Sequence, residues 1–317
     1  MKKIEDIDYK SINVSGSLYL VESNESNGFN FPYTLFIPSN IDSSTILIVE
    51  GANANKSSNT IKEGVEDVIE ACMNRKIIDF NNETNFPILT PCFPRIYDEE
   101  LGGIYTHMLT SKSLEYNKYG LKRIDLQLMS MIDDCKSKLK ELGCLVDEKI
   151  IIDGFSASAK FANRFSILHP EIVRLIISGA CSGTGILPLK EINGEKLLYP
   201  IGCGNVDEIT DEKIEEFKKI KQFYYMGLQD INDPLYQKDK VCDSPFLKPE
   251  ETEQLYKFIG KKMIPDRWEK FQLIYNQEGV NAFFESYKEF GHNPNPANDK
   301  VKQLLKEEKE KLKSRSI

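Results

Sequence analysis

Ser156 stands where an apolar segment changes abruptly into a helical pattern, within the sequence IIIDGFSASAKFANRF. The isoleucines predict a buried strand that ends at Asp153, and the residues from about Ser156 onward predict a helix. Only Gly154 and Phe155 separate the two elements, so the turn between them must be sharp. Such a turn strains the serine backbone and raises its hydroxyl above the carboxyl edge of a sheet. The pattern therefore predicts a serine held in place for nucleophilic attack.

The residues around this serine follow the pattern G-x-S-x-G with one change, because Ser158 replaces the last glycine. Small residues are needed at positions 154 and 158, since the strand and helix backbones crowd together there. The amino end of the helix would also direct free N–H groups toward negative charge that develops on a substrate oxygen. The structural alternative is an ordinary helix start that is capped by Ser156 or Ser158.

A serine nucleophile needs a base, and the sequence contains 3 histidines. His169 lies one helix beyond the serine, and a rise of about 1.5 Å per residue places it at the far end of that helix. His107 lies in an aromatic segment that could line a pocket. His292 follows the last predicted strand, in the sequence FGHNPNP, so we expect it at the same sheet edge as Ser156. We therefore favour His292 as the base over His107.

The base in turn needs a carboxylate that orients it. Asp230 follows the predicted strand QFYYMG closely, and Asp233 comes shortly after it. The chain order serine, aspartate, histidine is the order expected for a strand–turn–helix nucleophile. Turn chemistry is the alternative role for both aspartates, and it fits Asp233 better because Pro234 follows. We therefore predict Asp230 as the acid, with Asp233 as the second candidate.

Two backbone N–H groups are expected to bind the developing oxyanion. Ala157 directly follows the nucleophile and would supply one of them. The other would come from the small, polar loop GANANKSSN at residues 51–59, which follows a predicted strand. Ala52 and Asn53 are the candidates within residues 51–55, and the choice between them stays open. The alternative is that this segment is an ordinary connection between a strand and a helix.

The elements that must position these residues alternate between strands and helices. That alternation predicts a mainly parallel sheet with helices on both faces, within one domain over residues 1–317. Two longer segments, 181–220 and 235–280, could carry lid or cap pieces, and residues 92–119 are expected to be irregular. The predicted strands are 18–22, 33–38, 45–51, 86–91, 149–153, 173–180, 221–227 and 282–291, and the predicted helices are 59–75, 120–143, 156–169 and a charged C-terminal helix from 298.

The sequence resembles the α/β-hydrolase superfamily from about Ser43 to the C terminus. The resemblance depends on DGFSAS followed by HPE, on MGLQDINDP and on FGHNPNP, each after a predicted strand. It is closest to bacterial carboxylesterases and to polyhydroxyalkanoate-depolymerase-like proteins. The resemblance implies an α/β-hydrolase fold with small lid insertions, a triad of Ser156, Asp230 and His292, and Ala157 as an oxyanion donor. It implies no particular substrate.

Composition excludes several other classes of function. The net charge is −8 and the pI is about 5.2, so we expect no binding to nucleic acid. No stretch is long and apolar enough for a membrane span, and MKKIEDIDYK lacks the apolar region of a leader. The 7 scattered cysteines include no C-x-x-C pair, which favours reduced thiols in a cytoplasmic protein. Lys160 is four positions after Ser156, so a Ser-x-x-Lys mechanism is not expected.

Together these features predict a serine hydrolase that cleaves a small carboxylic ester through an acyl-enzyme on Ser156. No cofactor or metal is expected, and no H-E-x-x-H motif is present. Cleavage of an amide or peptide is the alternative within hydrolases, because it would use the same residues. A catalytically silent protein of the same fold, which binds a ligand or a partner, is the alternative outside them.

Overall fold

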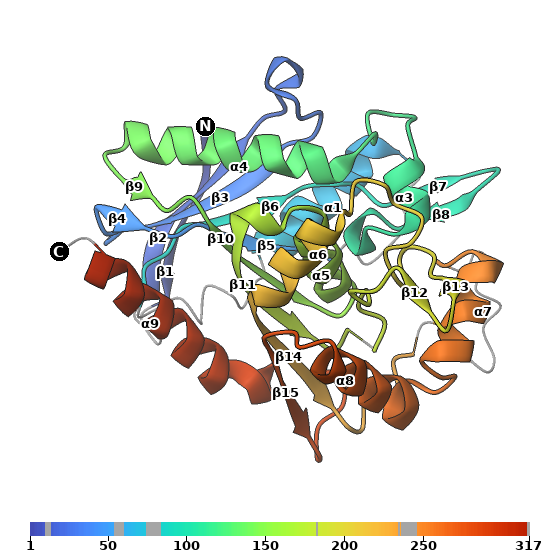
Figure 1. The fold of residues 1–317 in the computed structure, drawn as a ribbon. Helices are drawn as coiled ribbons and strands as arrows, with labels where there is room; N and C mark the ends of the chain where they lie inside the picture. The colour runs from blue at the N-terminus through green and yellow to red at the C-terminus, as the bar shows by residue number, and fades with distance from the viewer. Residues whose placement is uncertain are drawn as a thin grey trace.

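The computed structural model describes residues 1–9, 14–53, 60–73, 84–181, 183–233, 235 and 246–315. Its centre is a nine-stranded sheet with the strand order β1-β2-β3-β6-β5-β10-β11-β14-β15 (Figure 1). The strands are β1 (Lys2–Tyr9), β2 (Val14–Val21), β3 (Tyr33–Pro38), β5 (Ile48–Glu50), β6 (Ile88–Pro91), β10 (Ile150–Phe155), β11 (Val173–Gly179), β14 (Lys221–Gly227) and β15 (Ala282–Tyr287).

The six strands from β6 to β15 in this order pair in parallel, whereas β1, β2, β3 and β6 pair antiparallel. The mainly parallel sheet expected from the sequence is therefore confirmed. The main helices are α1 (Ile61–Met73), α4 (Ile124–Glu141), α5 (Ala157–Leu168), α6 (Asp211–Lys219), α7 (Pro249–Phe258), α8 (Trp268–Gln277) and α9 (Asn298–Arg315).

Both faces of the parallel sheet are covered. Along β10, Ile150 and Ile152 enter the core on one face, whereas Ile151 enters the core on the other. Helices α4 and α5 pack on the first face, and α9 packs on the second, so that Figure 1 shows α4 and α9 on opposite sides of the sheet. This two-sided burial explains why the central strands read as continuous apolar runs.

The strand order reverses between β5 and β10. The chain passes from β5 outward to β6 and later returns to β10 on the other side of β5. In an open parallel sheet, such a switch leaves a crevice at the carboxyl ends of the two strands, and ligands bind there. The segment Gly51–Asn53 follows β5 and Ser156 follows β10, so the predicted nucleophile and the predicted oxyanion loop meet at this switch point.

The structure differs from the sequence prediction in several elements. Strand β1 at the antiparallel edge was not predicted, because its sequence KKIEDIDY mixes charged and apolar residues. The predicted strand 45–51 is divided into β4 (Ser44–Thr45) and β5. Residues 92–119 are more regular than expected, since they form β7 (Ile96–Asp98), β8 (Gly102–Ile104), the 3-10 turn η3 (Thr106–Met108) and α3 (Ser111–Glu115). Asn59, the expected start of the helix that follows β5, lies outside the described residues.

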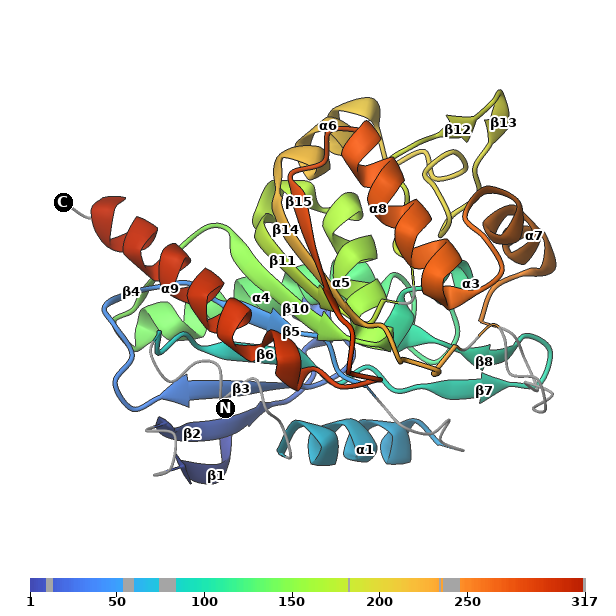
Figure 2. The same ribbon diagram turned by 90° about the horizontal axis from the view of Figure 1, so that it is seen from below.

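The two segments predicted as lid pieces contain short elements of their own. The first holds the hairpin of β12 (Glu191–Ile192) and β13 (Glu195–Lys196) together with α6, and the second holds α7 and α8. Figure 1 and Figure 2 place β7, β8, β12, β13 and α7 toward one end of the molecule, and α9 extends toward the other. A lid role for these segments stays a prediction.

Among the described residues, no helix combines the length and the apolar character needed to span a bilayer. Five of the cysteines whose side chains are described are buried and form no disulfide: Cys92, Cys135, Cys144, Cys181 and Cys203.

Candidate active site

Ser156 lies at a sharp turn between β10 and α5. Strand β10 continues to Phe155 and α5 begins at Ala157, so one residue joins the two elements. The turn is thus tighter than the sequence predicted, since the strand was expected to end at Asp153. Ser156 has φ 63° and ψ −115°, a conformation that an L-residue rarely adopts. Its N–H donates to the carbonyl oxygen of Gly179 at 2.7 Å, which keeps the strained residue in register with β11.

Two glycines make room for this turn. A Cβ atom on Gly154 would lie 2.3 Å from the carbonyl oxygen of Ser158, which is far inside van der Waals contact. A Cβ atom on Gly51 would lie 2.6 Å from Cβ of Ser158. The loop after β5 therefore presses directly on the start of α5, and only glycine permits that approach at either position.

Ser158, the departure from the G-x-S-x-G pattern, closes the turn by hydrogen bonding. Its Oγ accepts from the N–H of Phe155 at 3.0 Å and donates to the carbonyl oxygen of Phe155 at 3.0 Å. The side chain of Asn53 adds two further hydrogen bonds to the turn. Its Oδ1 accepts from the N–H of Ser158 at 3.0 Å, and its Nδ2 donates to the carbonyl oxygen of Phe155 at 2.8 Å. A serine at this position therefore stabilises the strained turn instead of disrupting it.

His292 and Asp230 form a hydrogen-bonded pair beside this turn. Nδ1 of His292 lies 2.7 Å from Oδ2 of Asp230, and Oδ1 of Asp230 accepts from the N–H of Asn232 at 2.8 Å. Asp230 is buried, whereas the imidazole is partly exposed. The His292 ring lies against the ring of Phe155, with centroids 4.8 Å apart. Because Phe155 directly precedes Ser156, the imidazole lies next to the turn that carries the serine.

The loops that carry the acid and the histidine touch through glycines. A Cβ atom on Gly227, at the end of β14, would lie 2.2 Å from the carbonyl oxygen of Gly291. The backbone N–H of Gln229 also donates to Phe290 O at 2.9 Å. This close contact between the ends of β14 and β15 brings together two residues that are far apart in the sequence.

Asp233, the second candidate for the acid, has another partner. Its Oδ1 accepts from Arg267 Nη2 at 2.6 Å and from the N–H of Leu235 at 3.0 Å. Both side chains of this ion pair are buried. Asp233 therefore anchors the segment before α8, and His292 is paired with Asp230 alone of the two aspartates.

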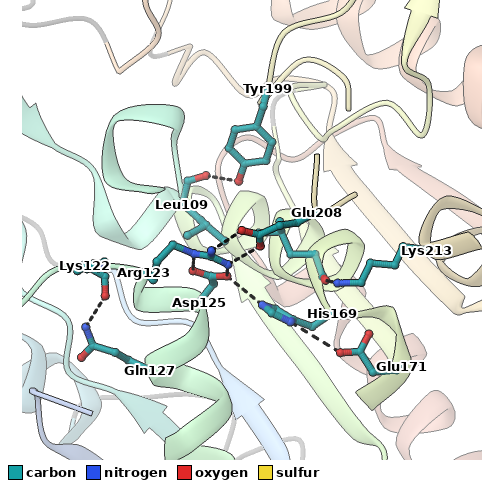
Figure 3. Close-up of polar contacts among 11 residues, drawn as sticks. Leu109, Lys122, Arg123, Asp125, Gln127, His169, Glu171, Tyr199, Glu208 and Lys213 are labelled. Atoms are coloured by element: carbon teal, nitrogen blue, oxygen red, sulfur yellow. Dashed lines mark hydrogen bonds and ion pairs between the residues drawn. The ribbon is translucent and has the colours of Figure 1, made fainter. Parts of the chain in front are cut away.

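His169 forms a separate polar network at the far end of α5, as Figure 3 shows. Its Nε2 lies 3.0 Å from Oδ2 of Asp125, which also receives a hydrogen bond from Arg123 at 2.7 Å. Arg123 also donates a hydrogen bond to the carboxylate of Glu208. As the sequence predicted, His169 lies at the helix terminus, because it directly follows Leu168, the last residue of α5.

His107 lines a small hollow beside the serine turn. The hollow is small, with a cavity volume of about 10 Å³, and its wall is formed by Gly51, Ala52, Pro91, Phe93, His107 and Phe161. Burial, together with nearby Arg95 and Lys160, lowers the pKa of His107 to about 3, so its imidazole is neutral at physiological pH. The structure thus places His107 in a pocket wall, as the sequence allowed.

The candidate oxyanion donors come from the start of α5 and from the loop after β5. Ala157 is the first residue of α5, and the first N–H groups of a helix have no partner inside it. Ala52 lines the hollow directly, and Asn53 is tied to the turn through its side chain. The remaining loop residues, 54–59, lie outside the described residues.

No family model matches the sequence, and no curated protein matches it significantly. Solved structures do match. Poly(aspartic acid) hydrolase-1 from Sphingomonas sp. KT-1 is 16% identical, with a TM-score of 0.57 over 92% of this chain and 98% of that chain. S-formylglutathione hydrolase from Agrobacterium tumefaciens is 12% identical, with a TM-score of 0.51 over 98% of this chain and 100% of that chain. The protein has the α/β-hydrolase fold.

These matches confirm the α/β-hydrolase fold that the sequence resemblance implied. The sequence prediction missed one feature of the site. Only the backbone of Asn53 was considered as a donor, whereas its side chain makes two hydrogen bonds to the serine turn.

Within the described part of the chain, no group of three or more His, Cys, Asp or Glu side chains is arranged to hold a metal ion.

Proposed function

We propose that the protein is a serine hydrolase that cleaves a carboxylic ester, with Ser156 as nucleophile, His292 as base and Asp230 as orienting acid. The observation that carries the proposal is the strained Ser156 backbone at the sheet edge, with the His292–Asp230 pair packed against the adjacent Phe155. The two solved neighbours are both hydrolases by name, which supports the reaction class.

In the first half of the proposed reaction, Ser156 Oγ attacks the ester carbonyl carbon as Nε2 of His292 accepts its proton. Asp230 holds Nδ1 at 2.7 Å, which fixes the ring tautomer and stabilises the imidazolium that forms. The N–H of Ala157 and one N–H from Ala52 or Asn53 bind the oxyanion. Collapse of the tetrahedral intermediate breaks the bond to the alcohol, which leaves with the proton from His292.

In the second half, water attacks the acyl-enzyme. His292 takes a proton from the water and returns it to Ser156 Oγ as the acyl–oxygen bond breaks, so the free acid leaves and the enzyme is restored. The acyl part would lie over the small hollow lined by Ala52, His107 and Phe161. We further propose that residues 181–220 and 235–280 of this single domain form a lid over the site.

Labelling with a fluorophosphonate probe tests this proposal. We expect wild-type protein to form a covalent adduct on Ser156, and Ser156→Ala to form none, because the probe reacts with an activated serine. Ser166→Ala is a matched control, since Ser166 lies on the same helix and donates to the carbonyl oxygen of Ala162. Equal labelling of wild type and Ser156→Ala would refute the proposal and leave a silent binding protein as the alternative.

A paired ester and amide of the same acyl group separates the two hydrolase candidates. Both substrates would use the same residues, but the amide has the poorer leaving group. We expect the ester to react and the amide to react much more slowly; an amide that reacts as fast would reassign the enzyme to amide cleavage.

A further inference from the structure

The side chain of Asn53 bridges two residues on either side of the nucleophile. Its Oδ1 accepts from the N–H of Ser158 at 3.0 Å, and its Nδ2 donates to the carbonyl oxygen of Phe155 at 2.8 Å. A planar amide that is bonded at both ends cannot rotate without losing one of the two bonds. One side chain from the loop after β5 therefore spans Ser156 and fixes its own position against the serine turn.

The bridge also limits which N–H groups of α5 a substrate can use. Ala157 and Ser158 are the first two residues of this helix, and the first N–H groups of a helix have no acceptor inside it. Because Asn53 occupies the N–H of Ser158, that group is not free to bind a substrate oxygen. Of these two residues, Ala157 is therefore the one whose N–H serves as a candidate donor.

The segment that would supply the second oxyanion donor is attached to β10 and its turn at both ends. The N–H of Gly51 donates to the carbonyl oxygen of Asp153 at 3.0 Å, which attaches the start of the segment to β10. Gly51 also lies so close to the helix start that a Cβ atom on it would come within 2.6 Å of Cβ of Ser158. The Asn53 side chain attaches the other end, so the buried Ala52 is held between two anchored residues.

We propose that the Asn53 side chain is a positioning group, which holds the two halves of the oxyanion site at a fixed separation before substrate binds. This inference rests on the proposed function, and it adds a role for a side-chain amide that itself takes no part in making or breaking bonds. Donors that are already in place need no reorganisation when charge develops on the substrate oxygen, which makes them effective. Small displacements of such donors are correspondingly costly to the rate.

Two substitutions remove the bridge in different ways, and both keep the backbone N–H at this position. Asn53→Ala removes both hydrogen bonds. Asn53→Asp keeps the shape and can still accept from the N–H of Ser158, but a carboxylate cannot donate to the carbonyl oxygen of Phe155. It also places a negative charge near the developing oxyanion. We therefore expect Asn53→Asp to be impaired at least as strongly as Asn53→Ala.

Asn281→Ala is the matched control. The side chain of Asn281 also donates to a backbone carbonyl oxygen of another segment, that of Lys219 at 3.3 Å. Asn281 directly precedes β15, whereas Ser156 directly follows the parallel strand β10, so the two residues lie at opposite edges of the sheet.

Trifluoroacetone tests the oxyanion site separately from the amount of folded protein. In its adduct, Ser156 Oγ bonds to the ketone carbon, the carbonyl electron pair becomes an alkoxide between the oxyanion donors, and the serine proton moves to Nε2 of His292. Its inhibition constant, measured by competition with fluorophosphonate labelling, does not depend on the folded fraction. We expect Asn53→Ala to raise this constant by about 10- to 100-fold and to lower the labelling rate constant by a similar factor. Asn281→Ala is expected to match wild type in both.

The outcomes separate this inference from the proposed function. Wild type that is not labelled by the fluorophosphonate would refute the proposed function. If wild type is labelled, but Asn53→Ala and Asn53→Asp leave either quantity at the wild-type value, the serine hydrolase stands and the positioning role is overturned. The role is also overturned if trifluoroacetone does not inhibit the labelled wild type, or if Asn281→Ala changes both quantities as much as Asn53→Ala does.

Discussion

The carboxylate of Asp230 accepts a hydrogen bond from His292, whereas that of nearby Asp233 pairs with the buried Arg267. Both aspartates are buried in the same connection after β14. Their different partners predict different consequences when each carboxylate is replaced by an amide of the same shape.

We predict that Asp230→Asn lowers kcat by about 10³- to 10⁴-fold, because an amide does not stabilise the imidazolium and can select the wrong tautomer of His292. The measurement is ester hydrolysis on protein whose thermal unfolding has been checked. A residual activity close to wild type would exclude Asp230 as the acid.

Asp233→Asn is predicted to act on stability instead. It removes one partner of the buried Arg267–Asp233 ion pair, and breaking such a pair costs about 3–5 kcal/mol of unfolding free energy. Chemical denaturation measures the loss. If the variant is as stable as wild type but loses hydrolysis as severely as Asp230→Asn, the two aspartates have been assigned in the wrong order.

The buried Lys160 is predicted to make the stability of the protein depend on pH. Burial, and then the nearby Arg164, lowers the pKa of Lys160 from 10.5 to about 8, with Arg267 acting in the same direction and Cys181 and Asp233 opposing. Its charged form therefore destabilises the folded state below about pH 8, and this cost disappears as the pH rises toward the unfolded value. Relative to Lys160→Met, wild-type stability should increase by about 3 kcal/mol from about pH 7 to about pH 10.

Denaturant unfolding of both proteins across this range, without ligand, checks the difference. The comparison with Lys160→Met cancels the groups that titrate in both proteins. A difference in unfolding free energy that does not change with pH would mean that the Lys160 ammonium has a counter-ion in the folded chain.

Among the elements, the ends of β14 and β15 must approach closely for Asp230 to reach His292. Gly227 permits this approach, because any side chain there would collide with the backbone at Gly291. We predict that Gly227→Ala lowers kcat/KM by about 10- to 100-fold through displacement of the histidine loop, since small misplacements of catalytic groups are costly.

Gly143→Ala is the control variant for Gly227→Ala. Gly143 has a positive φ of 86°, but an added Cβ atom would meet nothing within 4 Å. We expect it to cost about 1 kcal/mol of stability from backbone strain and to leave hydrolysis per folded molecule unchanged. If Gly227→Ala behaves like Gly143→Ala, the contact between the two loops does not position the histidine.

In the whole molecule, α9 covers the face of the sheet opposite α5. Four apolar residues of this helix are buried there: Val301, Leu304, Leu305 and Leu312. This layer is expected to stabilise the sheet without touching the site.

Leu305→Ala is predicted to lower the unfolding free energy by about 2–5 kcal/mol, because it leaves a cavity under a fully buried side chain. The fluorophosphonate labelling rate of the folded fraction should stay at the wild-type value. Glu310→Ala, which removes an exposed partner of Lys313, should change stability by less than about 0.5 kcal/mol. A slower labelling rate in Leu305→Ala would indicate that α9 supports the site as well.

Local patterns were sufficient to predict most of the sheet. Strands β3 and β14 match the predicted ranges residue for residue, because each is a short apolar and aromatic run between turn residues. The hairpin of β7 and β8 and the edge strand β1 were not predicted, since their residues take their conformation from pairing and not from a clear pattern of their own.

The chain order and residue types of Ser156, Asp230 and His292 can be read from the sequence, because each follows a strand with a strong local signal. The sequence left the choice between Asp230 and Asp233 open, since both follow the same strand and both fit a turn. The arginine that engages Asp233 is distant in sequence, so only the packed chain shows which aspartate is left to meet His292.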